Sequence, residues 1–263
     1  MKKKADWVEE QRVFFDEFAD KEGEDEGKWR GDFLNPSVFI HRRNENFLKF
    51  GMEEHLKEDG SLSKSVSVLD VGSGRGELAF FLLQKGFEVS VLDISRHSLM
   101  VLEKRVGILG FSRNLKKIIC GTLEDNITKI RNSFDYVVCN NFLHHVFNIE
   151  QTVGLMEKAV KPGGQVVFIE PNGQYPLWRF YRSNSFFEWK YEKGTLNCTK
   201  QNFEEILKRK GFKEIKILPI CFFPARIINK FPNLTEFLDN NLRKTIFSRF
   251  STGIMGRAKK PTQ

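Results

Sequence analysis

The chain has 263 residues, of which 40% are hydrophobic and 29% charged, an ordinary composition for a globular protein with one sizeable core. No apolar run approaches the ~20 residues of a membrane-spanning helix, and the basic start lacks the apolar stretch of a secretory signal, so a cytoplasmic protein is expected. The four cysteines show neither Cys-x-x-Cys pairs nor metal-ligand spacing, which argues against a disulfide scaffold and a cysteine metal site.

The net charge of +8 is concentrated near the C-terminus. Residues 200–263 contain 14 Lys or Arg against 5 Asp or Glu, whereas the rest of the chain is almost balanced. A basic segment of this kind can bind an acidic partner such as a lipid surface or nucleic acid, and it can equally be a solvated face.

Two helices are predicted before the first strand. Residues 5–20 place aromatic side chains at helical spacing. Asn35-Pro36 is typical of a helix start, and the second helix should run to about Leu56. We expect residues 1–60 to form an N-terminal helical cap, which either packs against the body of the protein or covers a ligand cleft.

From residue 66 onward strands and helices alternate, which predicts a parallel sheet covered on both faces. A short apolar strand that includes Asp70 leads into the glycine-rich turn Gly72-Ser-Gly-Arg-Gly76. Such a turn lets the backbone approach a bound molecule closely and directs N–H groups toward it. The third glycine comes one residue earlier than in a dinucleotide fingerprint, and the Asp70 carboxylate suits a cationic amino group better than a pyrophosphate.

The run Leu69-Asp-Val-Gly-Ser-Gly-Arg-Gly76 resembles the first motif of the class I S-adenosylmethionine-dependent methyltransferases. Leu143-His-His-Val146 and Lys161-Pro-Gly-Gly164 resemble the small-molecule branch of that family, which includes the ubiquinone and menaquinone biosynthesis methyltransferases. The resemblance covers residues 64–172. It implies an α/β fold with a doubly wound, Rossmann-like, seven-stranded sheet of order 3-2-1-4-5-7-6, whose last strand is antiparallel.

The resemblance also implies that S-adenosyl-L-methionine is the cofactor. A carboxylate at the tip of the second strand, Asp93, can accept hydrogen bonds from both ribose hydroxyls. Relatives usually have an acid where Thr122 stands, so in the turn over 122–125 the adenine contact should pass to Glu124 or Asp125, or to an apolar face and backbone N–H of Leu123. The implied cofactor-binding residues are Asp70, Gly72, Ser73, Gly74, Gly76, Asp93, Ile94, Leu123, Glu124 and Asn140.

Two histidines, His144 and His145, follow the fourth predicted strand and are the candidate catalytic residues. A histidine near neutrality can deprotonate a hydroxyl nucleophile. Consecutive helical residues point about 100° apart, so only one of the two can face the reacting centre, and a purely structural role is the alternative. Some quinone O-methyltransferases have carboxylates here that could hold a metal; with Asn141 and His144 in their place, no metal is expected.

Four parts are predicted: the cap over 1–60, a cofactor-binding core over 61–172, an aromatic lid insertion over 173–198, and the C-terminal part of the sheet over 199–263. The lid would close over the sulfonium by cation–π contact; a plain hydrophobic insertion is the alternative. The C-terminal part contains an apolar and basic segment, 222–250, which either contacts an anionic membrane surface peripherally or packs against the sheet or a dimer partner.

The predicted activity is methyl transfer to a small, lipid-like or lipid-linked molecule at oxygen. No Asn-Pro-Pro-Tyr or Asp-Pro-Pro-Tyr follows the fourth strand, which removes the usual sign of enzymes that methylate amino groups of bases or glutamine. The competing hypothesis is a non-catalytic or RNA-binding protein on the same scaffold, which only the basic C-terminal part favours. Nucleic acid is therefore not the expected partner, and no oligomeric state is predicted.

Overall fold

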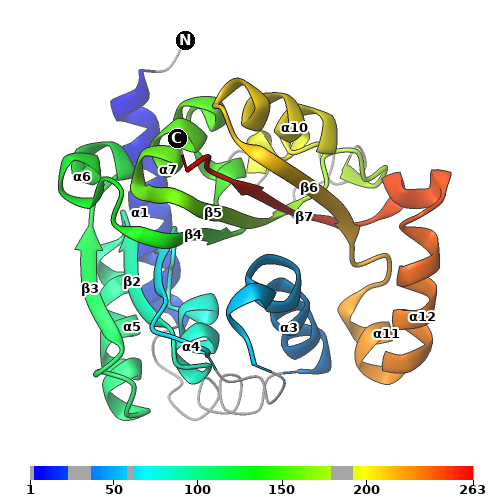
Figure 1. Ribbon diagram of the computed structural model, residues 1–263, viewed down its shortest axis with the longest axis horizontal. Helices are drawn as coiled ribbons and strands as arrows, with labels where there is room; N and C mark the ends of the chain where they lie inside the picture. Colours follow the sequence, from blue (N-terminus) through cyan, green and yellow to red (C-terminus); the bar gives the residue numbers. More distant parts are fainter. Residues whose placement is uncertain (1–2, 23–36, 58–61, 179–191, 263) are drawn as a thin grey trace.

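The computed structural model describes residues 3–22, 37–57, 62–178 and 192–262 (Figure 1). Seven strands form one sheet of order β3-β2-β1-β4-β5-β7-β6, in which β7 runs antiparallel to both neighbours. The predicted fold class and strand order are thus confirmed. The strands are β1 (Ser67–Val71), β2 (Glu88–Asp93), β3 (Leu115–Cys120), β4 (Phe134–Asn140), β5 (Val160–Pro171), β6 (Lys213–Ile220) and β7 (Gly253–Lys259).

Helices cover both faces of the sheet because side chains of each buried strand alternate between them. On β1, Val68 belongs to the core cluster under α3 (Val38–Met52), α4 (Glu77–Gln84) and α5 (Arg96–Ile108). The next residue, Leu69, belongs to the cluster under α6 (Leu123–Ile130), α7 (Ile149–Ala159) and α10 (Lys200–Arg209). The sheet is therefore doubly wound, as the alternating pattern predicts.

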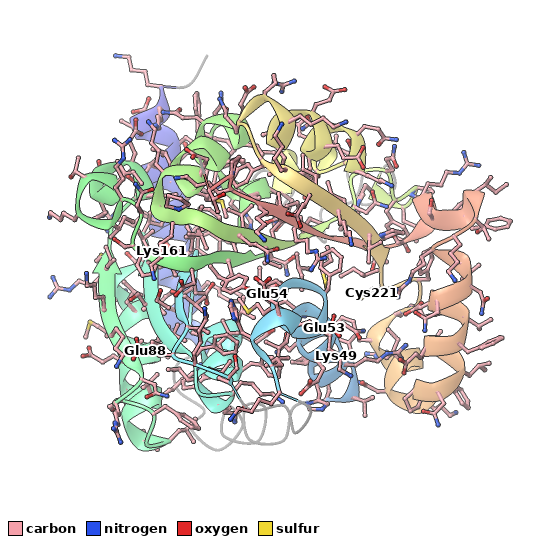
Figure 2. All side chains as sticks on the ribbon, viewed as in Figure 1. Lys49, Glu53, Glu54, Glu88, Lys161 and Cys221 are labelled. Carbon is pink, nitrogen blue, oxygen red and sulfur yellow. The ribbon has the colours of Figure 1, made fainter. Side chains whose placement is uncertain are left out.

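The two N-terminal helices lie apart (Figure 1). Helix α1 (Lys4–Glu22) runs beside α5, whereas α3 contributes Phe47, Leu48 and Met52 to the core. The short 3-10 helix η1 (Glu53–His55) fixes α3 on the sheet: Glu54 accepts hydrogen bonds from the Tyr136 hydroxyl (2.8 Å) and the Gln165 amide (2.9 Å) (Figure 2). The expected helix start at Asn35-Pro36 lies outside the described residues.

One predicted turn differs in detail from the structure. The segment after β3 is the start of α6, whose N-cap Thr122 accepts a hydrogen bond from the Asp125 N–H; a capping threonine followed by acids in the first turn is a helix start. In the Lys161-Pro-Gly-Gly164 motif, which lies at the start of β5, Gly163 has a positive φ, of 80°, and Gly164 does not. Gly164 is needed for space instead, because a Cβ there would lie 2.5 Å from the Asp135 carbonyl oxygen.

The amino-terminal edge of the sheet is fastened by Lys161 (Figure 2), whose ammonium group donates to Asp135 (3.0 Å) and Ser67 (3.2 Å). Lys161 belongs to the Lys161-Pro-Gly-Gly164 motif that resembles the methyltransferase family. It lies at the edge of the sheet opposite the carboxyl ends of β1, β2 and β4. The pairing of Val71 with Leu92 and of Asn140 with Ile169 brings those carboxyl ends together. Ligand sites of doubly wound sheets form at such an edge.

An insertion between β6 and β7 holds α11 (Ala225–Lys230), α12 (Pro232–Leu242) and the 3-10 helix η4 (Ile246–Phe250). It leaves and rejoins the sheet at adjacent points: Gly253 pairs with both Ile220 and Pro171, and the Thr252 N–H donates to the Cys221 carbonyl (2.8 Å). The insertion therefore lies at the carboxyl edge of the sheet. No helix within the described ranges combines the length and hydropathy that crossing a membrane requires.

Candidate functional site

A cavity of about 1000 Å³, open mouth included, lies at the carboxyl ends of β1, β2 and β3. Its floor consists of the glycine-rich turn after β1, the end of β2 and the residues that follow β3. Its opposite wall is α1. The described lining residues are Lys4, Trp7, Val8, Gln11, Phe15, Gly72, Gly74, Leu92, Asp93, Ile94, Ser98, Gly121, Thr122, Leu123, Glu124, Asn141, Phe142, His145, Val146, Phe147, Asn148, Gln151, Thr152 and Leu155.

Asp93 shapes the turn that faces this cavity. One of its carboxylate oxygens accepts a hydrogen bond from the Gly74 N–H (2.8 Å) and the other from the Ser95 N–H (2.8 Å). Burial raises the pKa of Asp93 above its ordinary value, and these N–H groups act against that rise. The Ile94 N–H also acts on this carboxylate, which has about four lone-pair sites and so keeps acceptor capacity for the ribose hydroxyls expected here.

Gly74 leaves the space into which a ligand fits. Its φ is +49°, and a Cβ built on it would meet no described atom within 4 Å although the residue lines the cavity. The side chain that glycine lacks would therefore occupy the cavity itself. Gly72 is needed for another reason, because a Cβ there would lie 2.2 Å from the Phe142 ring.

Asp70, Ser73, Gly76 and Asn140 lie behind this turn and, among the described residues, are not part of the cavity lining. Burial, with a contribution from the Asp93 charge, raises the pKa of Asp70 to about 7, while a hydrogen bond from the Ala79 N–H acts in the other direction. Asp70, Ser73 and Asn140 each keep one buried side-chain oxygen for which the described part of the chain offers no hydrogen-bond partner. Direct contact of Asp70 with a methionine amino group stays a prediction.

Leu123 and Glu124 line the cavity at the start of α6, as does Ile94 after β2. The Glu124 carboxylate forms an ion pair with Lys4 of α1 and accepts a hydrogen bond from the Gln151 amide (3.1 Å). It thus joins α1, α6 and α7 at the mouth of the cavity. An adenine contact through Glu124 stays a prediction, since its carboxylate already has these partners.

Helix α1 supplies one wall of the cavity; the sequence predicted a cap over a ligand cleft as one alternative but named no residues for it. The Trp7 indole N–H donates to the His145 carbonyl (2.9 Å), and the Phe15 ring meets the His145 ring edge-on at 5.1 Å. Gln11 is buried in the same wall, and its side-chain oxygen has no partner among the residues described. The aromatic spacing predicts the helix, but nothing local in it indicates what the helix contacts.

The two histidines have different surroundings. His145 lines the cavity. His144 is buried behind it, where its ring nitrogens lie 2.7 Å from a Glu170 oxygen and 3.3 Å from a Glu192 oxygen. Burial alone would lower the pKa of His144, but the two carboxylates outweigh it and raise the pKa to about 9. A protonated His144 cannot accept a proton at neutral pH, so of the two predicted catalytic residues only His145 is placed for that role.

Glu170, at the end of β5, organises the whole turn after β4. Besides His144, its carboxylate accepts the N–H groups of Phe142 (2.9 Å) and Leu143 (2.6 Å). In the sequence, Glu170 stands out only as an acid shortly after the Lys161-Pro-Gly-Gly164 motif. The residues that it binds lie more than twenty positions earlier, so its role could not be predicted. Glu170 therefore sets the backbone that presents His145 to the cavity.

The C-terminal end of the predicted lid, from Glu192 onward, packs against the turn that follows β4. Glu192 binds His144, and the 3-10 helix η3 (Lys193–Asn197) packs on η2 (Leu143–His145). The approach is close: a Cβ on Gly194 would lie 1.9 Å from the His144 carbonyl oxygen. Residues 179–191 of the predicted lid lie outside the described residues, so closure over a ligand stays a prediction.

His144, His145 and Glu192 also form the one group in the described part of the chain whose donor atoms lie close enough together, within 4.8 Å, to hold a metal ion. Both ring nitrogens of His144 face carboxylates and carry protons at neutral pH. A metal needs an imidazole lone pair. This arrangement is therefore a hydrogen-bonded structural group rather than a prepared metal centre.

Residues 62–211, more than half of the chain, match the family model of a methyltransferase domain. Ubiquinone biosynthesis O-methyltransferase of Idiomarina loihiensis is 33% identical over 139 residues, which cover 53% of this chain and 54% of the relative. The Vibrio atlanticus protein of the same name is 32% identical over 141 residues, covering 54% of this chain and 56% of the relative. The chain thus spans about half the length of the curated relatives it matches.

Solved structures share the fold at low sequence identity. Phosphoethanolamine N-methyltransferase 2 of Haemonchus contortus, in complex with S-adenosyl-L-methionine, superposes with a TM-score of 0.62 at 20% identity, covering 94% of this chain and 60% of that one. A SAM-dependent methyltransferase from Archaeoglobus fulgidus gives 0.57 at 16% identity, covering 90% of this chain and 100% of that one. At these identities the likeness concerns the fold.

Proposed function

Because the chain belongs to the family of methyltransferase domains, we propose that it transfers a methyl group from S-adenosyl-L-methionine to an oxygen atom of a small, lipid-like or lipid-linked molecule. The bound cofactor supplies an electrophilic methyl group on a sulfonium. The glycine-rich turn, Asp93, Ile94 and Leu123 would hold it, because these residues meet at one wall of the cavity and Gly74 leaves room there.

The main support for methylation at oxygen is the position of His145. It lines the same cavity as the cofactor residues, and Trp7, Phe15 and Phe142 line the cavity with it. A hydroxyl must lose its proton as its oxygen attacks, and an imidazole in the cavity wall can accept that proton. Aromatic walls favour an apolar acceptor and exclude water from the reacting atoms.

The step balances with these groups alone. S-adenosyl-L-methionine would supply the methyl group and leave as S-adenosylhomocysteine, the acceptor oxygen would gain the methyl carbon, and His145 would take the hydroxyl proton. The fold contributes alignment of the two reactants, which can supply several kcal/mol. Relatives named for ubiquinone biosynthesis support a lipid-linked phenolic acceptor, since that name describes methylation at oxygen on the way to a lipid-linked quinone.

Methyl transfer is tested with labelled S-adenosyl-L-methionine and two acceptors, a prenylated catechol and phosphoethanolamine. We expect label in the catechol. His145→Gln should lower turnover by about 10²–10⁴-fold while calorimetry shows S-adenosylhomocysteine binding unchanged. Full turnover by that variant would contradict the role of His145, and label in phosphoethanolamine alone would contradict oxygen as the acceptor. Cofactor binding without turnover on any acceptor, with retention on RNA, would favour the non-catalytic alternative.

A further inference from the structure

We propose that the insertion between β6 and β7 is a docking surface for an anionic lipid bilayer. This rests on the proposed lipid-linked substrate and names the surface by which the protein would meet it. Of the sixteen large hydrophobic side chains that are exposed in the described part of the chain, seven fall within 227–250. The docking surface comprises Ile227, Phe231, Leu234, Phe237, Ile246, Phe247 and Phe250.

Helix α12 is inverted in part relative to a normal surface helix, because it exposes large apolar side chains beside Asn233, Glu236 and Asn240 while it buries polar ones. Its polar residues Thr235 and Asp239 face inward and are 1% and 6% exposed, whereas Leu234 and Phe237 face outward and are 56% and 65% exposed. A helix that borders water places its apolar stripe toward the core. The outward apolar face of α12 is therefore suited to an environment other than water.

The inward polar face keeps this orientation fixed. The Arg42 guanidinium of α3 donates to the Pro232 carbonyl (2.9 Å) and the Thr235 hydroxyl (3.1 Å) and lies 3.8 Å from the Asp239 carboxylate. The Asn229 side chain of α11 accepts the Phe39 N–H (2.8 Å). Turning Leu234 and Phe237 toward the core would break these contacts, so the apolar side chains stay outside.

Charge selects an anionic bilayer as the partner. The insertion, residues 221–252, contains five Lys or Arg against two Asp or Glu, and one of these acids, Asp239, faces inward. The Lys230 ammonium lies 5.3 Å from the Phe231 ring centre and the Arg249 guanidinium 5.4 Å from that of Phe250. Bulky apolar groups beside basic groups are what an interfacial segment uses on anionic lipid. A second copy of this chain would bring two basic surfaces together.

The docking surface belongs to the edge of the sheet at which the cavity lies. The Asn172 side chain, directly after β5, donates to the Ser251 carbonyl (3.0 Å) next to η4. The insertion and the segment that follows β5 are thus joined at the carboxyl edge. Figure 1 shows α11 and α12 at the opposite end of the molecule from α1, so docking leaves the α1 wall uncovered.

The test is sedimentation of the full chain with vesicles of phosphatidylcholine, with or without phosphatidylglycerol, at low salt. We expect the wild type to sediment with the anionic vesicles and much less with the neutral ones. Leu234→Asp combined with Phe237→Asp should lower the partition coefficient at least tenfold, as should Lys244→Glu combined with Arg249→Glu, because each lost charge is worth about fivefold at such a surface. Met100→Asp on α5, at a side chain 57% exposed, is the matched control.

Wild-type protein that stays in solution with anionic vesicles overturns the docking surface, and so does an equal loss in the Met100 variant. A dimer in sedimentation equilibrium that the Leu234/Phe237 variant abolishes, without vesicle binding, would assign the surface to a second copy instead. Calorimetry with S-adenosylhomocysteine checks that each variant is folded. On the wild type it also separates the two proposals, because vesicle binding without cofactor binding refutes the function and not the surface.

Discussion

His144 shows how one buried side chain can couple a fold to pH. The histidine holds Glu170 and Glu192 together and is protonated when folded, with a pKa of about 9. An unfolded histidine titrates near pH 6.5. Because the folded value is the higher one, the stabilisation is complete below pH ~6.5 and is lost as the pH rises through about 9.

His144→Gln should therefore flatten the pH dependence of stability. Between about pH 7 and pH 10 the wild type should lose about 2–3 kcal/mol of unfolding free energy that the variant does not lose, because the variant has no proton to release. Urea unfolding at a series of pH values measures this. His41→Gln, at an exposed position on α3, should behave as the wild type, and parallel curves for His144→Gln and wild type would contradict the assignment.

Gly74 allows a test of the cavity at a single backbone position. Gly74→Val should abolish binding of S-adenosylhomocysteine, since the added side chain would enter the cavity. A valine at a positive φ also strains the backbone. Gly110→Val controls for that strain, because Gly110 has φ +79° and open space around it but lies away from the described lining. Calorimetry on both variants should show loss of binding only for Gly74→Val.

At the scale of elements, the sequence predicts best what is local. The strand over 67–71 and the glycine turn behind it were predicted because their apolar run and glycines are contiguous. The start of α6 was taken for a turn, although Thr122 with acids behind it is a capping pattern. A cap that covers a ligand cleft was one of the two predicted alternatives for the N-terminal helices, but the Trp7–His145 contact was not predictable, because it joins residues 138 apart and leaves no local pattern.

The wall makes α1 part of the site, which a substitution on its inner face can test. Trp7→Ala should weaken binding of S-adenosylhomocysteine or the methyl acceptor by about tenfold, because an aromatic wall and the bond to the His145 carbonyl are lost. Arg12→Ala, on the exposed face of the same helix, should leave both affinities unchanged. Equal affinities in all three proteins, by calorimetry and by KM, would show that α1 is only a packing helix.

At the scale of the whole molecule, the strand order and the edge that carries the cavity follow from the alternation of elements and the family resemblance. The distinct roles of the two histidines do not follow, since they depend on Glu170 and Glu192, which lie 26 and 48 residues beyond His144 in the sequence. The inverted face of α12 does not follow either. Which face of an amphipathic helix turns outward depends on its neighbour, here Arg42 of α3.

The way in which the insertion joins the sheet has a consequence for how such proteins diversify. Its two ends meet at Cys221 (Figure 2) and Thr252, where the Cys221 carbonyl accepts both the N–H and the hydroxyl of Thr252. A tight hairpin could therefore replace all that lies between them without altering strand pairing. Closing a shorter loop would cost less chain entropy than closing the present insertion. If the insertion docks on a membrane as proposed, membrane contact and methyl transfer would be encoded in separable parts of the chain, and exchanging the insertion would relocate the protein while its chemistry stays the same.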